Sequence, residues 1–320
     1  MLRQRLIPLI RWETPYLADA QKRVRSPALD TYFSVTANLG THTFYMIFLP
    51  LLFWCGQTSI ARAMVTILAA GVFLSGVLKD MWCLPRPLSP PLHRISMSKS
   101  TVLEYGFPST HSTNAVSVAV YTLFLLSQND SVLEPSIRIG LQVLTSLYAT
   151  SIILGRLYCG MHGFLDVIVG SALGALISTL QFRFGEDFDS LVYTGGPKTL
   201  CIAILVVLLL VRLHPEPADD CPCFDDSVAF AGVIIGMFIA SWHFARTDIA
   251  WNDVALASVP YDYNFLGFPR TFSRIILGTF LIVTWRELMK PALLGALPPI
   301  FRVIEDMGLT HARRFFLQAS

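Results

Sequence analysis

The sequence predicts an all-α, polytopic membrane protein built as a bundle of about eight transmembrane helices. Of the 320 residues, 53% are hydrophobic and 14% are charged, whereas a soluble domain carries about 25% charged residues. The mean hydropathy is +0.56. The hydrophobic residues are gathered into separate runs, most close to the roughly 20 residues that a helix needs to cross a bilayer. A helix satisfies its own backbone polar groups inside lipid, so helices are the expected form of these runs.

Eight apolar runs are candidate spans, and no internal repeat or low-complexity segment interrupts them. They lie near residues 33–54, 60–78, 112–127 (extended on its N-terminal side), 137–154, 164–182, 198–213, 227–245 and 272–288. We expect three regions: a basic segment over residues 1–32, a five-helix core over 33–182, and further transmembrane helices with a C-terminal tail over 183–320.

The N-terminal region carries six basic residues among scattered apolar ones, from Arg3 to Arg25. This pattern suits a segment lying on the bilayer surface, and it suits a flexible basic tail equally well. The first apolar piece is too short and too soon interrupted for a cleaved signal peptide.

Charge and cysteine content limit the classes of partner. A net charge of +2 with no dominant patch gives no case for nucleic-acid binding, so membrane lipids are the expected partners. The six cysteines lie in or beside apolar runs, apart from Cys221 and Cys223, and imply no disulfide framework.

Two later loops have distinct compositions. Residues 213–227 hold His214, Cys221 and Cys223 among several acids; a zinc or calcium site is conceivable, but the irregular ligand spacing favours a solvated acidic turn. Residues 245–271 hold mixed charges and aromatics, and we expect a structural or partner-binding loop there.

Three polar stretches stand out at the ends of apolar runs. They contain Lys79 to Pro87, Phe107 to His111, and Gly155 to Asp166. If each run crosses the membrane once, the second run ends, the third begins, the fourth ends and the fifth begins on the same face. Counting crossings therefore predicts that all three stretches meet there, although hydropathy did not require it.

The third stretch offers a histidine nucleophile. His162 and Asp166 are four residues apart and would share a helix face, so Asp166 can accept a hydrogen bond from one ring nitrogen and leave the other free. A pair at this spacing is also an ordinary helical feature. Arg156 changes the interpretation, because a guanidinium beside such a histidine suits recognition of phosphate oxygens.

The other two stretches add anion-binding groups and an acid. After Pro108, the residues Ser109, Thr110 and His111 open a helix whose free N–H groups favour an anion, and His111 could protonate a leaving alkoxide. Lys79 at the end of the second run would stabilise its helix and reach the interface. That explanation covers Arg86, held between two prolines, less well.

Together the three stretches resemble the signature of the phosphatidic acid phosphatase type 2 and haloperoxidase superfamily. Its usual form is K-x6-R-P, P-S-G-H and S-R-x5-H-x3-D; here Thr110 replaces the commonest glycine and Gly155 the serine. P-S-T-H is the form of the sphingosine-1-phosphate phosphatase branch. The run Gly155 to Gly163 and the segment His214 to Phe230 are similar to fungal long-chain-base phosphate phosphatases. The superfamily resemblance covers about residues 35–182, and the closer one extends through most of the chain.

The resemblance implies a metal-independent lipid phosphate phosphatase of sphingolipid metabolism, with no cofactor and with its catalytic core in residues 33–182. His162 would form a phosphohistidine, Asp166 would orient it, and His111 would act as general acid and base. Phosphate would be held by the remaining motif residues, Lys79, Arg86, Ser109, Thr110 and Arg156.

The substrates implied are sphingosine, dihydrosphingosine or phytosphingosine 1-phosphate in the endoplasmic reticulum membrane, with a lumenal site. Alternatives are polyisoprenyl (dolichyl) diphosphate, phosphatidic acid, or a non-catalytic transporter or scaffold. The basic N-terminus lies on the same face as the site, and positive-inside counting would make that face cytosolic.

Overall fold

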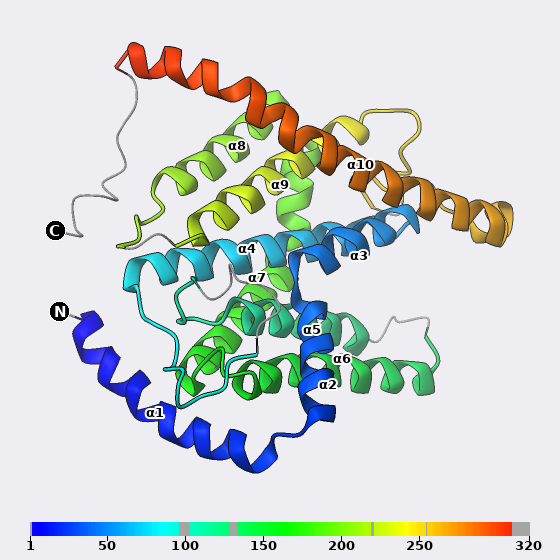
Figure 1. Cartoon of the computed structure of the whole chain (residues 1–320). Coiled ribbons are helices and arrows are strands. Elements are labelled where there is room, and N and C mark those ends of the chain that lie inside the picture. Colours follow the sequence, from blue (N-terminus) through cyan, green and yellow to red (C-terminus); the bar gives the residue numbers. More distant parts are fainter. Residues whose placement is uncertain (1, 96–102, 129–132, 219–220, 254, 309–320) are drawn as a thin grey trace.

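The computed structural model describes residues 2–95, 103–128, 133–218, 221–253 and 255–308. Across these residues the chain forms ten α-helices and a short 3₁₀ turn, η1 (Asn38–Gly40), and no strand. The helices are α1 (Leu2–Val24), α2 (Pro27–Ala37), α3 (His42–Trp54), α4 (Thr58–Trp82), α5 (Thr110–Ser127), α6 (Pro135–Tyr158), α7 (Phe164–Thr194), α8 (Pro197–Arg212), α9 (Cys223–Phe244) and α10 (Tyr263–Asp306). Figure 1 shows their arrangement. The prediction of an all-helical membrane protein is confirmed.

Every apolar run expected to span the membrane is largely helical, but the number of spans differs from the expectation. Within the described residues, α4, α6, α7, α9 and α10 are long and apolar enough to cross a bilayer. The α8 helix has only 16 residues and α3 only 13. The count of eight is therefore not reproduced by helix length and composition.

The first run is not one helix. The chain leaves α2 through η1, and Thr41 caps the start of α3 by accepting a hydrogen bond from the backbone N–H of Phe44. The expectation of a continuous span over residues 33–54 was therefore wrong. The break places Gly40 against His111, since a Cβ at Gly40 would lie 3.2 Å from Cδ2 of that histidine.

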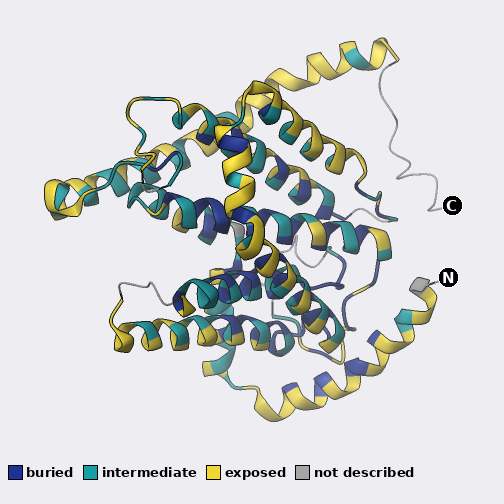
Figure 2. Ribbon diagram, turned by 180° about the vertical axis from the view of Figure 1, so that it is seen from behind, coloured by how far each residue is buried: buried dark blue, intermediate teal, exposed yellow. Residues whose placement is uncertain are grey.

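The centre of the bundle is the packing of α4, α5 and α7. Two glycines of α7, Gly170 and Gly174, allow it to approach α5 closely. A Cβ at Gly170 would lie 2.6 Å from the carbonyl oxygen of Ser109, and a Cβ at Gly174 would lie 2.2 Å from that of Thr113. Burial in Figure 2 follows this pattern, with α4 well buried and α10 largely exposed. The N-terminal ends of α5 and α7 thus lie side by side, which brings two of the polar stretches together.

The basic N-terminal segment forms a helix that packs beneath the loops of these helix ends. Ile10 packs with Leu84 and Phe107, and Leu17 packs with Leu92. Gln21 donates hydrogen bonds to the carbonyls of His93 and Tyr158 (2.7 and 2.8 Å) and accepts one from the His93 N–H. Residues 2–24 are thus helical and docked on the protein's own loops, and the placement of this segment on the bilayer surface stays a prediction.

The loop before α10 is structural at the opposite end of α4. Arg62 of α4 is buried, forms an ion pair with Asp189 (3.0 Å), and donates to the carbonyl of Leu256 at 2.7 Å. The hydroxyl of Thr58 accepts from the Val259 N–H.

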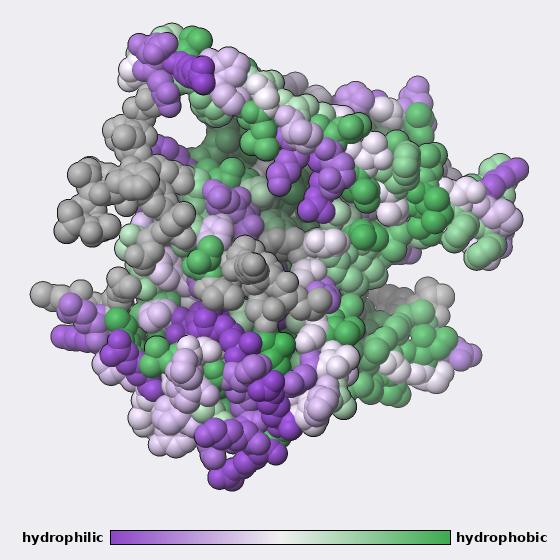
Figure 3. Space-filling view, viewed as in Figure 1, coloured by the Kyte–Doolittle hydropathy of each residue, from purple (hydrophilic) through white to green (hydrophobic). Residues whose placement is uncertain are grey.

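In Figure 3 hydrophilic side chains gather at the lower left, around α1, whereas hydrophobic ones dominate the right-hand side. The α1 end is therefore the polar end of this face.

Candidate active site

The structure brings the three polar stretches into contact. Nη1 of Arg86 lies 3.0 Å from Nε2 of His162, which joins the loop after α4 to the start of α7. The backbone N–H of Ser109 donates to the carbonyl of Asp166 at 3.0 Å, which joins the start of α5 to α7. The convergence expected from counting crossings is therefore present in the fold.

The ring of His162 is buried and its protonation is determined by its two neighbours. Nδ1 lies 2.8 Å from the carbonyl oxygen of Gly106, and a carbonyl can only accept. Nε2 faces a guanidinium, which can only donate. The proton is thus on Nδ1, and the lone pair of Nε2 points towards the cations.

The surroundings of His162 keep its imidazole neutral. Burial, and then the positive charges of Arg86, Arg156 and Lys79, lower the pKa of His162 well below its usual value. A neutral imidazole with an aimed lone pair is the form that can attack phosphorus.

Asp166 has a different contact from the one expected. Its Oδ2 lies 3.6 Å from Nδ1 of His162, longer than a hydrogen bond, and accepts instead from the backbone N–H of Gly163 at 2.7 Å. Asp166 therefore caps the first turn of α7, and the Gly106 carbonyl holds the ring directly. A backbone carbonyl in a loop leaves no signal in a sequence, so this partner could not be predicted.

The predicted residues at the start of α5 have separate contacts. Ser109 is fully buried, and its Oγ accepts from the N–H of Ser112 (3.3 Å) and from its hydroxyl (3.0 Å). The hydroxyls of Thr110 and Ser75 are 2.9 Å apart. His111 lies beside Gly40, and its charge is among those that lower the pKa of His162. The charge of His111 therefore acts on the ring of His162.

The three predicted cations are all buried. Arg86 is the most constrained: Nε donates to the carbonyl of Glu104 (3.0 Å) and Nη1 to that of Met161 (2.8 Å). Burial lowers the pKa of Arg86. Nε of Arg156 is buried and has no hydrogen-bond partner among the described residues. A buried guanidinium with unused donor capacity is suited to binding an anion.

Two glutamates at the site were missed by the sequence reasoning. Glu104 lies 2.7 Å from Nζ of Lys79 and 3.5 Å from Nη2 of Arg86. Glu13 of α1 accepts from the N–H of Leu165 at 3.1 Å, at the start of α7, and burial raises its pKa. Glu104 stands five residues before Ser109, and its position beside a motif was the available signal. Glu13 lies in the N-terminal segment, whose basic residues gave no indication that an acidic side chain there would reach the site.

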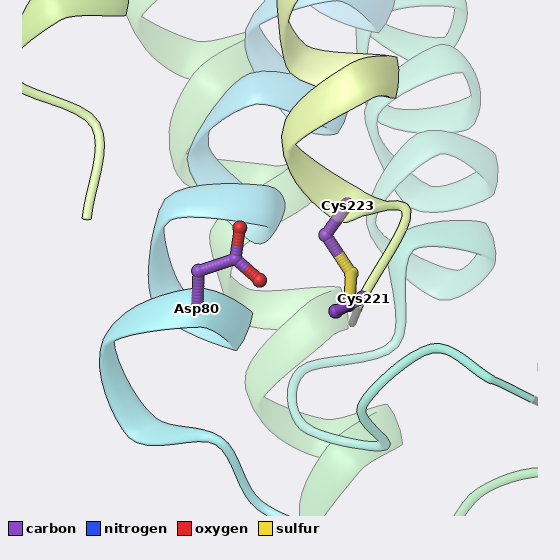
Figure 4. A group of neighbouring side chains, drawn as sticks. All are labelled: Asp80, Cys221 and Cys223. Atoms are coloured by element: carbon purple, nitrogen blue, oxygen red, sulfur yellow. A yellow bond between two sulfur atoms is a disulfide. The ribbon is translucent and has the colours of Figure 1, made fainter. Parts of the chain in front are cut away.

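The acidic loop is partly buried, contrary to the expectation of a solvated turn. Cys221 and Cys223 are joined by a disulfide and lie against Asp80 of α4, as Figure 4 shows. His214 packs there too, with Nε2 3.1 Å from the hydroxyl of Ser227. Glu216 and Asp225 are exposed, and Asp219 and Asp220 lie outside the described residues.

This grouping bears on the metal site and the disulfide bonding considered for the loop. Asp80, Cys221 and Cys223 have the spacing of a metal cluster, with ligand atoms within 4.8 Å of one another. Because the two sulfurs are bonded to each other, the thiolates needed for a metal are not available in this form. The sequence implied no disulfide framework, and this single bridge joins two residues of the loop that are two positions apart.

An apolar cavity of 590 Å³ opens between α2, α3, α5 and α6. Its lining includes Leu39, Phe44, Tyr45, Thr145 and Ile152. A Cβ built on Gly40 would lie 3.7 Å from Cδ1 of Ile152 and 3.2 Å from Cδ2 of His111, so Ile152 of the cavity wall lies near the second histidine. Its volume lies within the range of about 300–1,000 Å³ that is usual for ligand sites.

Comparisons with known proteins agree with this geometry. The PAP2 superfamily model matches residues 60–189. A dihydrosphingosine 1-phosphate phosphatase of Schizosaccharomyces pombe is 40% identical over 94% of this chain and 72% of its own length. Another of that name from Saccharomyces cerevisiae is 35% identical, over 92% and 71%. A human sphingosine-1-phosphate phosphatase 2 is 30% identical, over 85% and 67%.

The match to the superfamily model includes Lys79, Arg86, Ser109, His111, Arg156, His162 and Asp166. The two fungal relatives extend the similarity over more than nine tenths of the chain. The chain therefore belongs to the PAP2 superfamily, and within it to the family of the dihydrosphingosine and sphingosine 1-phosphate phosphatases.

Proposed function

We propose that this protein hydrolyses the phosphate monoester of sphingoid bases (sphingosine, dihydrosphingosine or phytosphingosine 1-phosphate) in sphingolipid metabolism. One observation carries the proposal: the Gly106 carbonyl and the Arg86 guanidinium leave the lone pair of His162 on Nε2, facing the cations. The names of the related proteins support the substrate class.

The reaction has two displacements at phosphorus. Nε2 of His162 attacks, the bond between phosphorus and the ester oxygen breaks, and the leaving oxygen takes a proton from His111. Water then attacks the phosphohistidine, gives its proton to His111, and the electron pair of the breaking N–P bond returns to Nε2. His111 thus ends the cycle protonated, as it began.

Charge stabilisation comes from residues of the chain itself. The positive charges of Arg86, Arg156 and Lys79 each lower the pKa of His162, and these three side chains would hold the phosphoryl oxygens during the transfer. The N-terminal turn of α5, with Ser109 and Thr110, offers backbone N–H groups to the same anion. Asp166 caps the start of α7, and His162 lies in the loop just before that helix.

The cavity next to His111 suits the alkyl chain of a membrane lipid. A substrate with its phosphate in the headgroup layer would place its chain among the apolar lining of the cavity. We place the catalytic core at residues 33–182, which contain the motif residues of the site and most of the residues that line the cavity.

We further propose that the protein resides in the endoplasmic reticulum membrane with the site on the lumenal side. Positive-inside counting opposes this orientation because α1 is basic. However, Lys79, Arg86 and Arg156 serve phosphate binding, and α1 is held to the site by Gln21 and its apolar face. Labelling of single introduced cysteines in sealed microsomes tests the orientation, and labelling of the site face from the cytosolic side would reverse it.

The catalytic test uses purified protein with radiolabelled sphingoid-base phosphate in the presence of EDTA. We expect phosphate release, and an acid-labile phosphoprotein on rapid quenching that His162→Ala abolishes. His93→Ala, an exposed histidine of the same face, is the matched control and should keep both. Turnover by His162→Ala would exclude the covalent step, and loss of activity in EDTA would exclude the metal-free mechanism. A preference for phosphatidic acid or dolichyl diphosphate would replace the proposed substrate.

A further inference from the structure

The cations that would hold phosphate are already engaged by a carboxylate. Oε2 of Glu104 lies 2.7 Å from Nζ of Lys79 and 3.5 Å from Nη2 of Arg86, and its backbone carbonyl accepts from Nε of Arg86. Lys79 and Arg86 have only 3% and 5% of their side chains exposed, and Glu104 has 15%. One carboxylate thus contacts two of the three cations assigned to phosphate.

Without that carboxylate, like charges would face one another in a buried space. The positive charges of Lys79, Arg86 and Arg156 each lower the pKa of His162. Buried cations need a counter-charge, because their desolvation is otherwise uncompensated. Glu104 supplies one negative charge to this group, and no motif assigns it a role.

Glu104 does not lie where a residue that only positions the cations would lie. A support would hold a cation from behind and leave its phosphate-facing atoms free. Here the carboxylate contacts Nζ of Lys79, which is the only charged group of that side chain and the group that must reach the phosphate. The Glu104 carboxylate and the phosphate would therefore compete for the same Nζ. By contrast, Nε of Arg156 has no hydrogen-bond partner among the residues described, so this guanidinium is open to the first contact.

We propose that Glu104 is the resident counter-anion of the phosphate subsite, which the phosphoryl group displaces on binding and which recaptures Lys79 and Arg86 as inorganic phosphate leaves. This proposal rests on the proposed function for the location of the phosphate. Arg156 meets the incoming phosphate, Glu104 yields Nζ of Lys79, and the reverse exchange promotes release. Glu104 therefore weakens the hold of the site on free phosphate and limits inhibition by that product.

The test measures binding of inorganic phosphate to the full-length protein in detergent by titration calorimetry, and product inhibition in parallel. Glu104→Gln keeps the size of the side chain and removes its charge, so the phosphate no longer competes with an anion. We expect the dissociation constant for phosphate to fall by about tenfold or more, as loss of one close like charge predicts. Glu186→Gln, the same change at an exposed position near the far end of α7, should leave it unchanged.

A purely structural role for Glu104 predicts the opposite sign. If the carboxylate only positions Lys79 and Arg86, Glu104→Gln would weaken phosphate binding, and that result, or no change, overturns the proposal. Should Glu104→Gln fail to fold, Glu104→Asp keeps the charge but shortens the reach to Nζ. It should tighten phosphate binding by a smaller factor, and unchanged or weaker binding would again overturn the idea.

Direct binding also separates this proposal from the proposed function. If the wild-type protein hydrolyses no lipid phosphate while Glu104→Gln still tightens phosphate binding, the proposed function fails and the role of Glu104 stands. If hydrolysis occurs but the sign of the Glu104→Gln effect is reversed, only the counter-anion role fails.

Discussion

Arg86 and His162 meet at 3.0 Å, between Nη1 of the guanidinium and Nε2 of the imidazole. The contact joins the loop after α4 to the start of α7 and assigns the imidazole lone pair. The same guanidinium donates to the carbonyls of Glu104 and Met161. Arg86 thus organises His162 and the loops around it, in addition to the phosphate-binding role proposed for it.

Arg86→Lys should therefore not be a conservative change. A lysine keeps the charge but cannot make the three directed contacts of the guanidinium. We expect kcat/KM for the lipid phosphate to fall by about 10²-fold or more, the usual loss when a preorganised donor is removed. Arg212→Lys, at the exposed end of α8, is the control. Steady-state kinetics within threefold of wild type for Arg86→Lys would contradict this account.

The depressed pKa of His162 predicts a nucleophile that stays neutral in mildly acidic solution. Protonation removes the lone pair of His162, so kcat/KM should decrease as His162 is protonated. The midpoint of this decrease in the pH profile should lie below pH 6.5, the usual pKa of histidine. Raising pH through this pKa increases activity. Nitrogen NMR of ¹⁵N-histidine-labelled protein, assigned with His162→Gln, should show the Nδ1–H tautomer at pH 7. A protonated ring at that pH would contradict the assignment.

The same shift has a consequence for folding. The unfolded chain binds a proton at His162 more tightly than the native state does, so native stability from this group is present above about pH 6.5 and is lost as pH falls. Thermal melting of wild type between pH 7.5 and 5 should decline more steeply than that of His162→Gln. Equal slopes would show that His162 does not contribute.

The close packing of α5 and α7 predicts an intolerant glycine. Alanine at Gly174 would place Cβ 2.2 Å from the carbonyl oxygen of Thr113, so the helices must separate. We expect a melting temperature several degrees lower and reduced turnover, since α5 carries His111. Gly140→Ala in α6 meets nothing within 4 Å and should be neutral or stabilising, by up to about 1 kcal/mol. Similar melting temperatures for the two variants would contradict the close approach.

The α1 helix should contribute to catalysis through Glu13, which caps the start of α7. Glu13→Ala removes the acceptor and should lower stability by about 1 kcal/mol, with a fall in kcat as the start of α7 loosens. Glu13→Gln keeps an acceptor and avoids burying a charge, so it should resemble wild type. Chemical denaturation in parallel with kinetics checks both, and equal losses in the two variants would show that the charge itself is needed.

If the cavity holds the alkyl chain of the substrate, a substitution that narrows the cavity should weaken the binding of long-chain substrates. Thr145→Phe narrows the cavity and should raise KM for long-chain sphingoid phosphates several-fold, while hydrolysis of p-nitrophenyl phosphate stays the same. Ser146→Phe, on the exposed side of the same helix, is the matched control. A proportional loss with both substrates would indicate damage to the site and not to chain binding.

The sequence by itself determined the helices and named the residues of the proposed site. Apolar runs of near-membrane length and the spacing of Lys79, Arg86, His111, Arg156, His162 and Asp166 were sufficient, because hydropathy and covalent spacing are local properties. Counting crossings even predicted that these stretches meet. Local patterns also misled: a continuous run over 33–54 hid the break at Gly40, since a capping threonine and a 3₁₀ turn are compatible with high hydropathy.

Only the tertiary structure decided which groups contact the side chains of the proposed site. The Gly106 carbonyl holds the ring of His162, Asp166 caps α7, and Glu104 and Glu13 bring carboxylates to a site expected to hold mainly cations. These contacts join residues 25 to 152 positions apart, except for the local cap of Asp166. Their formation depends on how α1, α4, α5 and α7 pack, which no local pattern encodes.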